Sequence, residues 1–199
     1  MMLPTGRVAL FAHAMGYIIT RMSDKYTYDE LVYDGKIAKV HKVGLAMADG
    51  NVVQRDFIHY DGAALIIPVL DDGSIVMIRN YRFAVDEMLW ELPAGMLEDG
   101  EDPAVCAARE LTEETGYTAD RIEKLGRFYT GPGTTDEVMH CFLATGLTDG
   151  RQNLDRYEEI SVEVTAPDTV CEMVTDGRIH DGKTIAALMM YRLRQDNLS

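Results

Sequence analysis

The chain has 199 residues, of which 47% are hydrophobic and 26% are charged, and its formal net charge at pH 7 is -14. This size and composition fit a globular chain with its own hydrophobic core, and they exclude a fibrous repeat or a fully disordered chain. The negative charge opposes the nucleic-acid backbone, whose binding depends on clustered Lys and Arg, so nucleic acid is excluded as a partner.

The first apolar stretch, residues 8–19, contains His13 and Gly16 and is shorter than the roughly 18 to 20 residues of a membrane span. A signal peptide is the alternative interpretation, but Arg7 is the only basic residue before the stretch and no clear small-residue cleavage site follows it. The cysteines lack the spacing of a disulfide framework or a zinc site. We therefore expect a cytoplasmic protein with no membrane partner.

The next part of the chain has the pattern of β-strands. Residues 26–60 contain alternating apolar patches separated by Asp-Gly turn dipeptides, which predicts a set of antiparallel strands. Residues 63–70 and 74–80 are β-rich runs joined by Asp71-Asp72-Gly73, a hairpin signal. We expect these two runs to form the centre of the sheet.

A helix is predicted over about residues 103–115, because Asp102 is suited to the N-cap, Pro103 to the first helical position and Gly116 to the end. The remaining elements are predicted as three strands and two helices, at residues 122–129, 138–144 and 160–164, and at residues 167–175 and 183–195. With no internal repeat or linker, this order predicts a mixed α/β sandwich.

The predicted helix at 103–115 carries an acidic cluster. Glu110 and Glu114 are four residues apart, so their carboxylates can share one hard cation, and Arg109 can pair with Glu113 one turn on. The apolar positions of the helix point the other way, so we expect the cluster to face outward from the sheet. A solvated acidic helix face, which charge runs usually form, is the alternative.

Residues 95–117 resemble the Nudix box: Gly, five residues, Glu, seven residues, Arg-Glu, an aliphatic, any residue, Glu-Glu, any residue, Gly and a hydrophobic residue. Every specified position matches, with Tyr117 in place of an aliphatic at the last one. The resemblance implies a Nudix α/β/α sandwich with a mixed sheet, in which the box forms loop, helix and loop. It also implies a Nudix hydrolase domain over residues 61–199, preceded by an N-terminal antiparallel strand region over residues 1–60.

By the same resemblance, Mg²⁺ is held by Glu110, Glu114 and the backbone carbonyl of Ala94. Glu113 is both a candidate ligand and a candidate catalytic residue, and Arg109 orients the glutamates. These oxygen ligands suit Mg²⁺ or Mn²⁺ better than Zn²⁺. Divalent cations neutralise charge on phosphate oxygens and activate water, as hydrolysis of a diphosphate requires.

The flanks of the box, residues 78–95 and 129–137, resemble those of ADP-ribose pyrophosphatases. In that subfamily a proline lies about sixteen residues after the box glycine, and here Pro132 lies sixteen residues after Gly116. An ordinary turn proline is the alternative. The resemblance implies hydrolysis of ADP-ribose to AMP and ribose 5-phosphate. Another nucleoside diphosphate sugar, such as GDP-mannose or UDP-glucose, and a non-catalytic ADP-ribose-sensing module stay open.

Several residues of the upstream flank are candidates for contacts with the substrate. Arg79 and Arg82 can offer forked donors to phosphate or ribose oxygens, and Phe83 and Trp90 offer π-faces for a base. Glu91 can accept from the adenine amino group or the ribose. Each arginine can equally be a surface charge, and Glu91 a surface residue at a strand end.

The general base must come from outside the box, because carboxylates beside a dication are poor proton acceptors. In related ADP-ribose pyrophosphatases, a glutamate in the loop that corresponds to residues 153–159 activates the water, which implies Glu158 or Glu159. Glu137, in the loop of Pro132 and so also close to a bound substrate, is the competitor. Adjacent glutamates ahead of a strand are otherwise usually solvated.

Members of this subfamily are typically homodimers whose N-terminal strands cross to the partner and help to build the nucleotide pocket. The strand-like region up to residue 60 therefore predicts a homodimer. Residues 1–20 match no recognised pattern, and two interpretations stay open for them: disorder, or a different start site.

Overall fold

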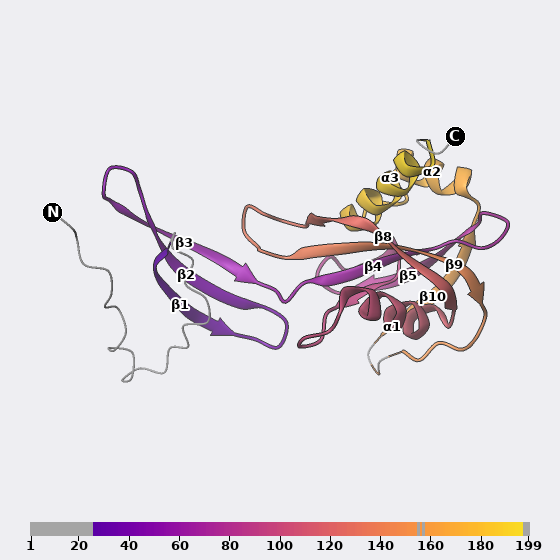
Figure 1. Cartoon of the computed structure of the whole chain (residues 1–199), viewed down its shortest axis with the longest axis horizontal. Helices are drawn as coiled ribbons and strands as arrows, with labels where there is room; N and C mark the ends of the chain where they lie inside the picture. Colours follow the sequence, from indigo (N-terminus) through magenta and orange to yellow (C-terminus); the bar gives the residue numbers. More distant parts are fainter. Residues whose placement is uncertain (1–25, 155, 157, 197–199) are drawn as a thin grey trace. The chain divides into compact units, whose positions relative to one another are not determined.

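The computed structural model describes residues 26–154, 156 and 158–196. The apolar stretch at 8–19 and the question raised about residues 1–20 lie outside them. The chain divides into two compact units (Figure 1). One contains the described residues up to Tyr60 together with Gly133–Asp136, and the other contains Asp61–Pro132 and the described residues from Glu137 onwards.

The first unit is an antiparallel sheet of β1 (Tyr26–Asp34), β2 (Lys39–Ala46) and β3 (Val52–His59), in that order. The predicted antiparallel strand region is therefore confirmed. Its buried polar centre is His41, whose Nδ1 lies 2.6 Å from Asp29 Oδ1 and whose ring stacks on the ring of Phe57.

The second unit contains a four-stranded mixed sheet and a three-stranded antiparallel sheet. The four-stranded sheet has the order β7, β4, β9, β8, with β4 parallel to β9, and its strands are β4 (Ala63–Pro68), β7 (Ala94–Met96), β8 (Thr118–Tyr129) and β9 (Val138–Thr148). The other has the order β10, β5, β6, and its strands are β5 (Ile75–Arg82), β6 (Glu87–Glu91) and β10 (Ile160–Thr165).

Helices cover both faces of the mixed sheet, so the predicted α/β/α sandwich is confirmed. In β4, Leu65 and Ile67 pack in a core with α2 (Pro167–Thr175) and α3 (Gly182–Asp196). Ala64 and Ile66 point the other way, into a core with α1 (Pro103–Thr115), and Figure 1 shows these helices on opposite sides. Burial on both faces explains why β4 is a continuous apolar run.

The ends of α1 agree with the prediction. The side chain of Asp102 accepts a hydrogen bond from the backbone N–H of Ala104 at 2.8 Å, and Gly116 ends the helix with a φ of 82°, in the left-handed region that glycine favours. Two short strands, β6 and β7, were not predicted. Within the described residues, no helix is both long enough and apolar enough to cross a membrane.

Candidate active site

The acidic cluster of α1 is buried, and the expectation that it faces outward is wrong. Glu110 is 8% exposed and Glu114 is 3% exposed, and they share their helix face with Leu111. The physical reason is that β7 and the residues before it cover this side of the helix. The backbone N–H of Ala94 donates to Glu114 Oε2 at 2.9 Å.

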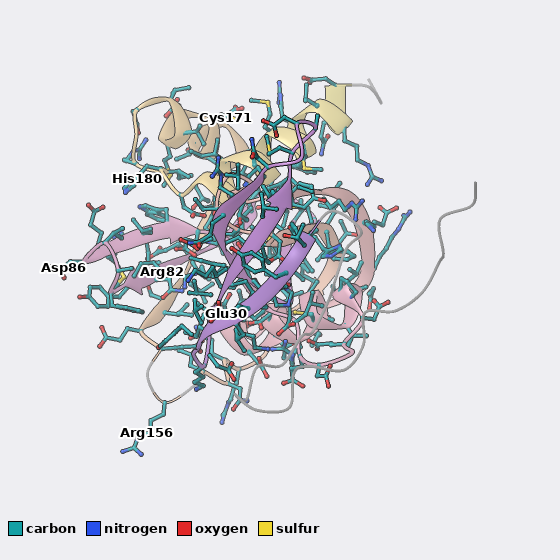
Figure 2. The ribbon with its side chains drawn as sticks, turned by 90° about the vertical axis from the view of Figure 1, so that its left-hand side faces the viewer. Glu30, Arg82, Asp86, Arg156, Cys171 and His180 are labelled. Carbon is teal, nitrogen blue, oxygen red and sulfur yellow. The ribbon has the colours of Figure 1, made fainter. Side chains whose placement is uncertain are left out.

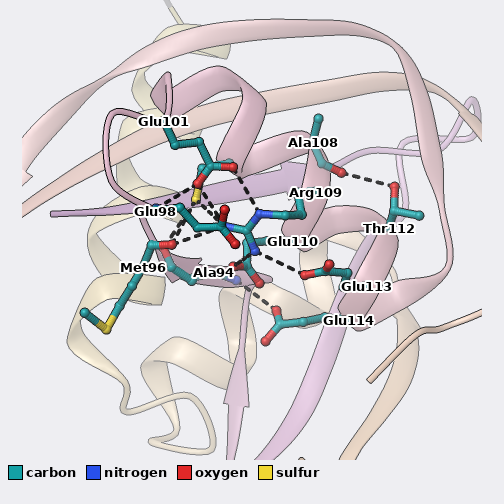
Figure 3. A network of polar contacts seen from close by, with 12 residues as sticks. Ala94, Met96, Glu98, Glu101, Ala108, Arg109, Glu110, Thr112, Glu113 and Glu114 are labelled. Carbon is teal, nitrogen blue, oxygen red and sulfur yellow. Dashed lines mark hydrogen bonds and ion pairs between the residues drawn. The ribbon is translucent and has the colours of Figure 1, made fainter. Parts of the chain in front are cut away.

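The guanidinium of Arg109 lies at the centre of three carboxylates (Figure 3). Its Nε and Nη2 donate to the two oxygens of Glu101, each at 3.0 Å, and its Nη1 donates to Glu110 at 2.6 Å and to Glu113 at 3.1 Å. The predicted contact between Arg109 and Glu113 is therefore present. Hydrogen bonds from Arg109 lower the pKa of Glu101 to about 2, so this carboxylate stays charged at neutral pH.

Burial gives the two central glutamates unusual titration properties. Removal from water, together with the charges of Glu110 and Glu158, raises the pKa of Glu114 to about 8, although the N–H of Ala94 and the charge of Arg82 act in the opposite direction. Burial also raises the pKa of Glu110, against the opposing effect of Arg109. Two buried carboxylates one turn apart, of which only Glu110 has a cation in contact, favour protonation or a bound cation.

Position 95, at the start of the box, requires glycine for a steric reason. A Cβ built on Gly95 would lie 1.8 Å from Glu110 Oε1 and 2.1 Å from its carboxyl carbon. The carboxylate therefore rests directly against the backbone of residue 95, where only glycine leaves room for it.

The donor chemistry of the acidic cluster fits Mg²⁺ or Mn²⁺, because every donor is a hard oxygen. Among the described residues, no three His, Cys, Asp or Glu side chains are already grouped as a metal site. Instead, Glu110 is engaged by Arg109, and Glu114 accepts from the N–H of Ala94, the residue whose carbonyl was predicted as a ligand. A bound cation would require the carboxylates to change partners.

A second network of charges surrounds Glu91, which is 0% exposed. Arg82 donates to both of its oxygens, from Nε at 2.7 Å and from Nη2 at 2.6 Å, and Lys183 Nζ lies 2.8 Å from Oε2. The interpretation of Glu91 as a surface residue is therefore wrong. With both oxygens engaged and buried, Glu91 has no exposed atom with which to accept from a substrate.

Arg79 and Trp90 lie opposite each other on β5 and β6, with the guanidinium 4.8 Å from the centre of the indole ring. Arg79 Nη2 donates to the carbonyl of Met88 at 3.2 Å, whereas its buried Nε has no hydrogen-bond partner in the described part of the chain. One face of Trp90 is thus covered by a cation. Phe83 follows β5 and is 80% exposed.

The two candidate bases ahead of β10 differ in their surroundings. The charge of Glu158 acts on Glu110 and Glu114 and raises the pKa of both. The pKa of Tyr81 is raised, first by its hydrogen bond to Asp86 and also by the charge of Glu159. Of the two, Glu158 is the one whose charge raises the pKa of the acidic pair of α1.

The chain ahead of Glu158 is anchored to the end of α1. Gln152 Nε2 donates to the carbonyl of Glu114 at 2.6 Å, and the N–H of Asn153 donates to the carbonyl of Glu113 at 2.9 Å. These contacts satisfy carbonyls that a helix end leaves unpaired. No local sequence pattern predicts these contacts or the contact between Lys183 and Glu91.

The loop between β8 and β9 contains the predicted residues Pro132 and Glu137. Pro132 is exposed. Glu137 accepts a hydrogen bond from the hydroxyl of Thr130 across the base of this loop. Its carboxylate is not among the charges that shift the pKa of Glu110 or Glu114.

Comparison with known proteins places these features in context. A model of the NUDIX domain matches residues 59–188. An ADP-ribose pyrophosphatase of Bacillus subtilis is 34% identical over 87% of this chain and 95% of its own length. A GDP-mannose pyrophosphatase of Cronobacter sakazakii is 37% identical over 75% of this chain and 84% of its own. The crystal structure of an ADP compounds hydrolase has the same fold, with a TM-score of 0.78 and 20% identity over 87% of this chain and 95% of that one.

Proposed function

The chain belongs to the Nudix family and is a Nudix hydrolase, and we propose that it hydrolyses ADP-ribose to AMP and ribose 5-phosphate in a reaction that depends on Mg²⁺. The observation that carries the proposal is the pair of buried glutamates, Glu110 and Glu114, held one helical turn apart beside Gly95. The ADP-ribose pyrophosphatase relative supports the choice of substrate.

Glu110, Glu114 and the carbonyl of Ala94 would hold the cation, which Mn²⁺ could replace, and Glu113 is the further ligand. When bound, the cation would neutralise charge on the phosphate oxygens and lower the pKa of a bound water. Arg109 has a different task, because its contacts orient Glu101, Glu110 and Glu113 relative to one another.

Glu158 is the general base in this proposal. It lies outside the box, and its charge acts on Glu110 and Glu114, so it can accept a proton from a water placed near them. Glu159 acts on Tyr81 instead, and Glu137 is engaged by Thr130.

Substrate recognition would use the β5–β6 hairpin. Arg82 and Arg79 supply donors for the phosphate and ribose oxygens, and the exposed ring of Phe83 and the partly exposed ring of Trp90 supply surfaces for the base. Pro132 shapes the loop between β8 and β9.

We also propose a homodimer formed through the N-terminal sheet. Five large apolar side chains of this region are about half exposed or more, which favours a protein partner: Val32, Tyr33, Ile37, Met47 and Val52. Light scattering should give twice the mass of the chain. Substitution of Tyr33 by Asp should lower that mass, and a monomeric mass for the unmodified protein would refute the proposal.

The substrate proposal is tested with a panel of ADP-ribose, GDP-mannose and UDP-glucose in Mg²⁺, with the products separated by chromatography. ADP-ribose should give the highest kcat/KM and yield AMP, and EDTA should abolish turnover. The GDP-mannose pyrophosphatase relative makes GDP-mannose the second candidate. A preference of tenfold or more for GDP-mannose, about 1.4 kcal/mol in transition-state binding, would select it instead.

A further inference from the structure

Glu91 is an unusual carboxylate, because it is completely buried and contacted by two cations from distant parts of the chain. Arg82 approaches from β5, and Lys183 approaches from α3. Nη2 of Arg82 and Nζ of Lys183 share a single oxygen, Oε2, at 2.6 and 2.8 Å. The position of the carboxylate is therefore determined from both sides.

The contact with Glu91 fixes the guanidinium of Arg82 and leaves part of it open. Nε and Nη2 are engaged, but among the described residues Nη1 forms no hydrogen bond or ion pair, and the side chain is 40% exposed. Figure 2 shows Arg82 closer to the body of the sheet than Asp86 at the tip of the hairpin. The charge of Glu114 acts on Arg82, so the guanidinium lies within electrostatic reach of this one of the two buried glutamates.

Lys183 is held on a rigid part of the fold. The hydroxyl of the next residue, Thr184, is buried and accepts a hydrogen bond from the N–H of Leu92 at 3.1 Å. Lys183 Nζ also lies 3.0 Å from Asp181 Oδ1, while Asp181 Oδ2 accepts from the N–H of Thr184. The first turn of α3 thus joins the chain directly after Glu91.

We propose that Lys183 is a positioning residue for recognition of a phosphate: it holds Glu91 in the one orientation that points Nη1 of Arg82 at an oxygen of the substrate's diphosphate. This inference rests on the proposed function, because it assumes a diphosphate substrate. Glu91 acts through Arg82 and makes no contact with the substrate itself. Without the ammonium group, Glu91 can turn within its pocket, and the fork of Arg82 turns with it.

The test is Lys183→Met, which keeps the aliphatic chain and removes the charge. Because a hydrogen bond to a charged phosphate is lost or weakened in both ground and transition state, KM should rise about tenfold while kcat changes little. Lys183→Arg should restore KM. Lys124→Met, at an exposed lysine of β8, is the matched control and should leave both constants unchanged.

A double-mutant cycle separates positioning from general stability. Arg82→Met should raise KM by itself, and Lys183→Met should cause no further rise of KM in that background. Thermal melting reports separately whether Lys183→Met lowers stability, with Arg82 present and with Arg82 replaced. If Lys183→Met does not fold, Lys183→Gln, which keeps a donor without the charge, should also raise KM.

The substrate for these measurements is the member of the nucleoside diphosphate sugar panel with the highest kcat/KM. An unchanged KM in Lys183→Met, or an equal rise with and without Arg82, overturns the role of Lys183 and leaves the proposed function standing. If the unmodified protein hydrolyses no member of the panel, the proposed function is overturned, and this inference with it.

Discussion

Substitution of Glu114 by Gln should stabilise the metal-free protein at high pH while it abolishes turnover. The pKa of Glu114 is about 8 in the folded protein, above the ordinary value of 4.5 for Glu. Between these two values the folded state binds more protons than the unfolded state, so stability falls as pH rises through this window. One unit of difference between the folded and unfolded pKa corresponds to about 1.4 kcal/mol. Ionised Glu114 therefore lowers the free energy of unfolding by at most about 4 to 5 kcal/mol above pH 8.

The measurement is urea unfolding in EDTA at pH 5 and pH 9, followed by fluorescence of Trp90, the single tryptophan of the chain. Gln cannot lose a proton, so Glu114→Gln should differ little from the unmodified protein at pH 5 and exceed it by at least about 2 kcal/mol at pH 9. Glu137→Gln is the matched control. The same difference at both pH values would refute the reasoning.

With Mg²⁺ in place of EDTA, the unmodified protein should become more stable than Glu114→Gln. A ligand that binds only the folded state stabilises it by about 2.7 kcal/mol at a hundred times its Kd. Mg²⁺ should therefore raise the unfolding free energy of the unmodified protein at pH 8 and have little effect on Glu114→Gln. If both proteins respond equally, Glu114 does not hold the cation.

Three further predictions follow from the site. Glu158→Gln should lower kcat by about 10² to 10⁴, and Glu159→Gln should have a small effect; equal losses in steady-state assays would exclude Glu158 as the base. Gly95→Ala should weaken Mg²⁺ about tenfold or more, because its Cβ would displace Glu110, and a Mg²⁺ titration of turnover tests this. Asp102→Ala should cost about 1 kcal/mol of stability in urea and leave kcat unchanged, since the N-cap lies about two helical turns before Glu110 and three before Glu114; a larger loss of kcat than of stability would contradict this.

The sequence predicted the features that depend on local chemistry. Asp102 and Gly116 determine the ends of α1 through contacts within a few residues, and β4 is recognisable as an uninterrupted apolar run. The strands β6 and β7 are short and lie on either side of Pro93, which interrupts the alternation that would have revealed them.

The burial of Glu110 and Glu114 could not be predicted from the helix alone. Helical periodicity gives the direction of each side chain, but β7 decides which of those directions is covered. The same holds for Glu91 and Lys183, which are 92 residues apart and meet only because α3 packs against the chain after β6. Burial of a charged side chain depends on partners that no local pattern specifies.

The contrast between Glu91 and Glu114 indicates what each carboxylate does. Both are buried in the same unit, and the charge of Arg82 reaches both. Glu91 has two cations within 2.8 Å, so the protein itself supplies the charge that its burial requires. Among the described residues, the carboxylate of Glu114 receives a hydrogen bond only from the N–H of Ala94. A buried carboxylate without a cation of its own is costly to the fold, and such a cost is typical of functional sites, where a ligand supplies the missing interaction. Glu91 is therefore best understood as part of the structure that orients Arg82, and Glu114 as a position whose burial favours a metal ion.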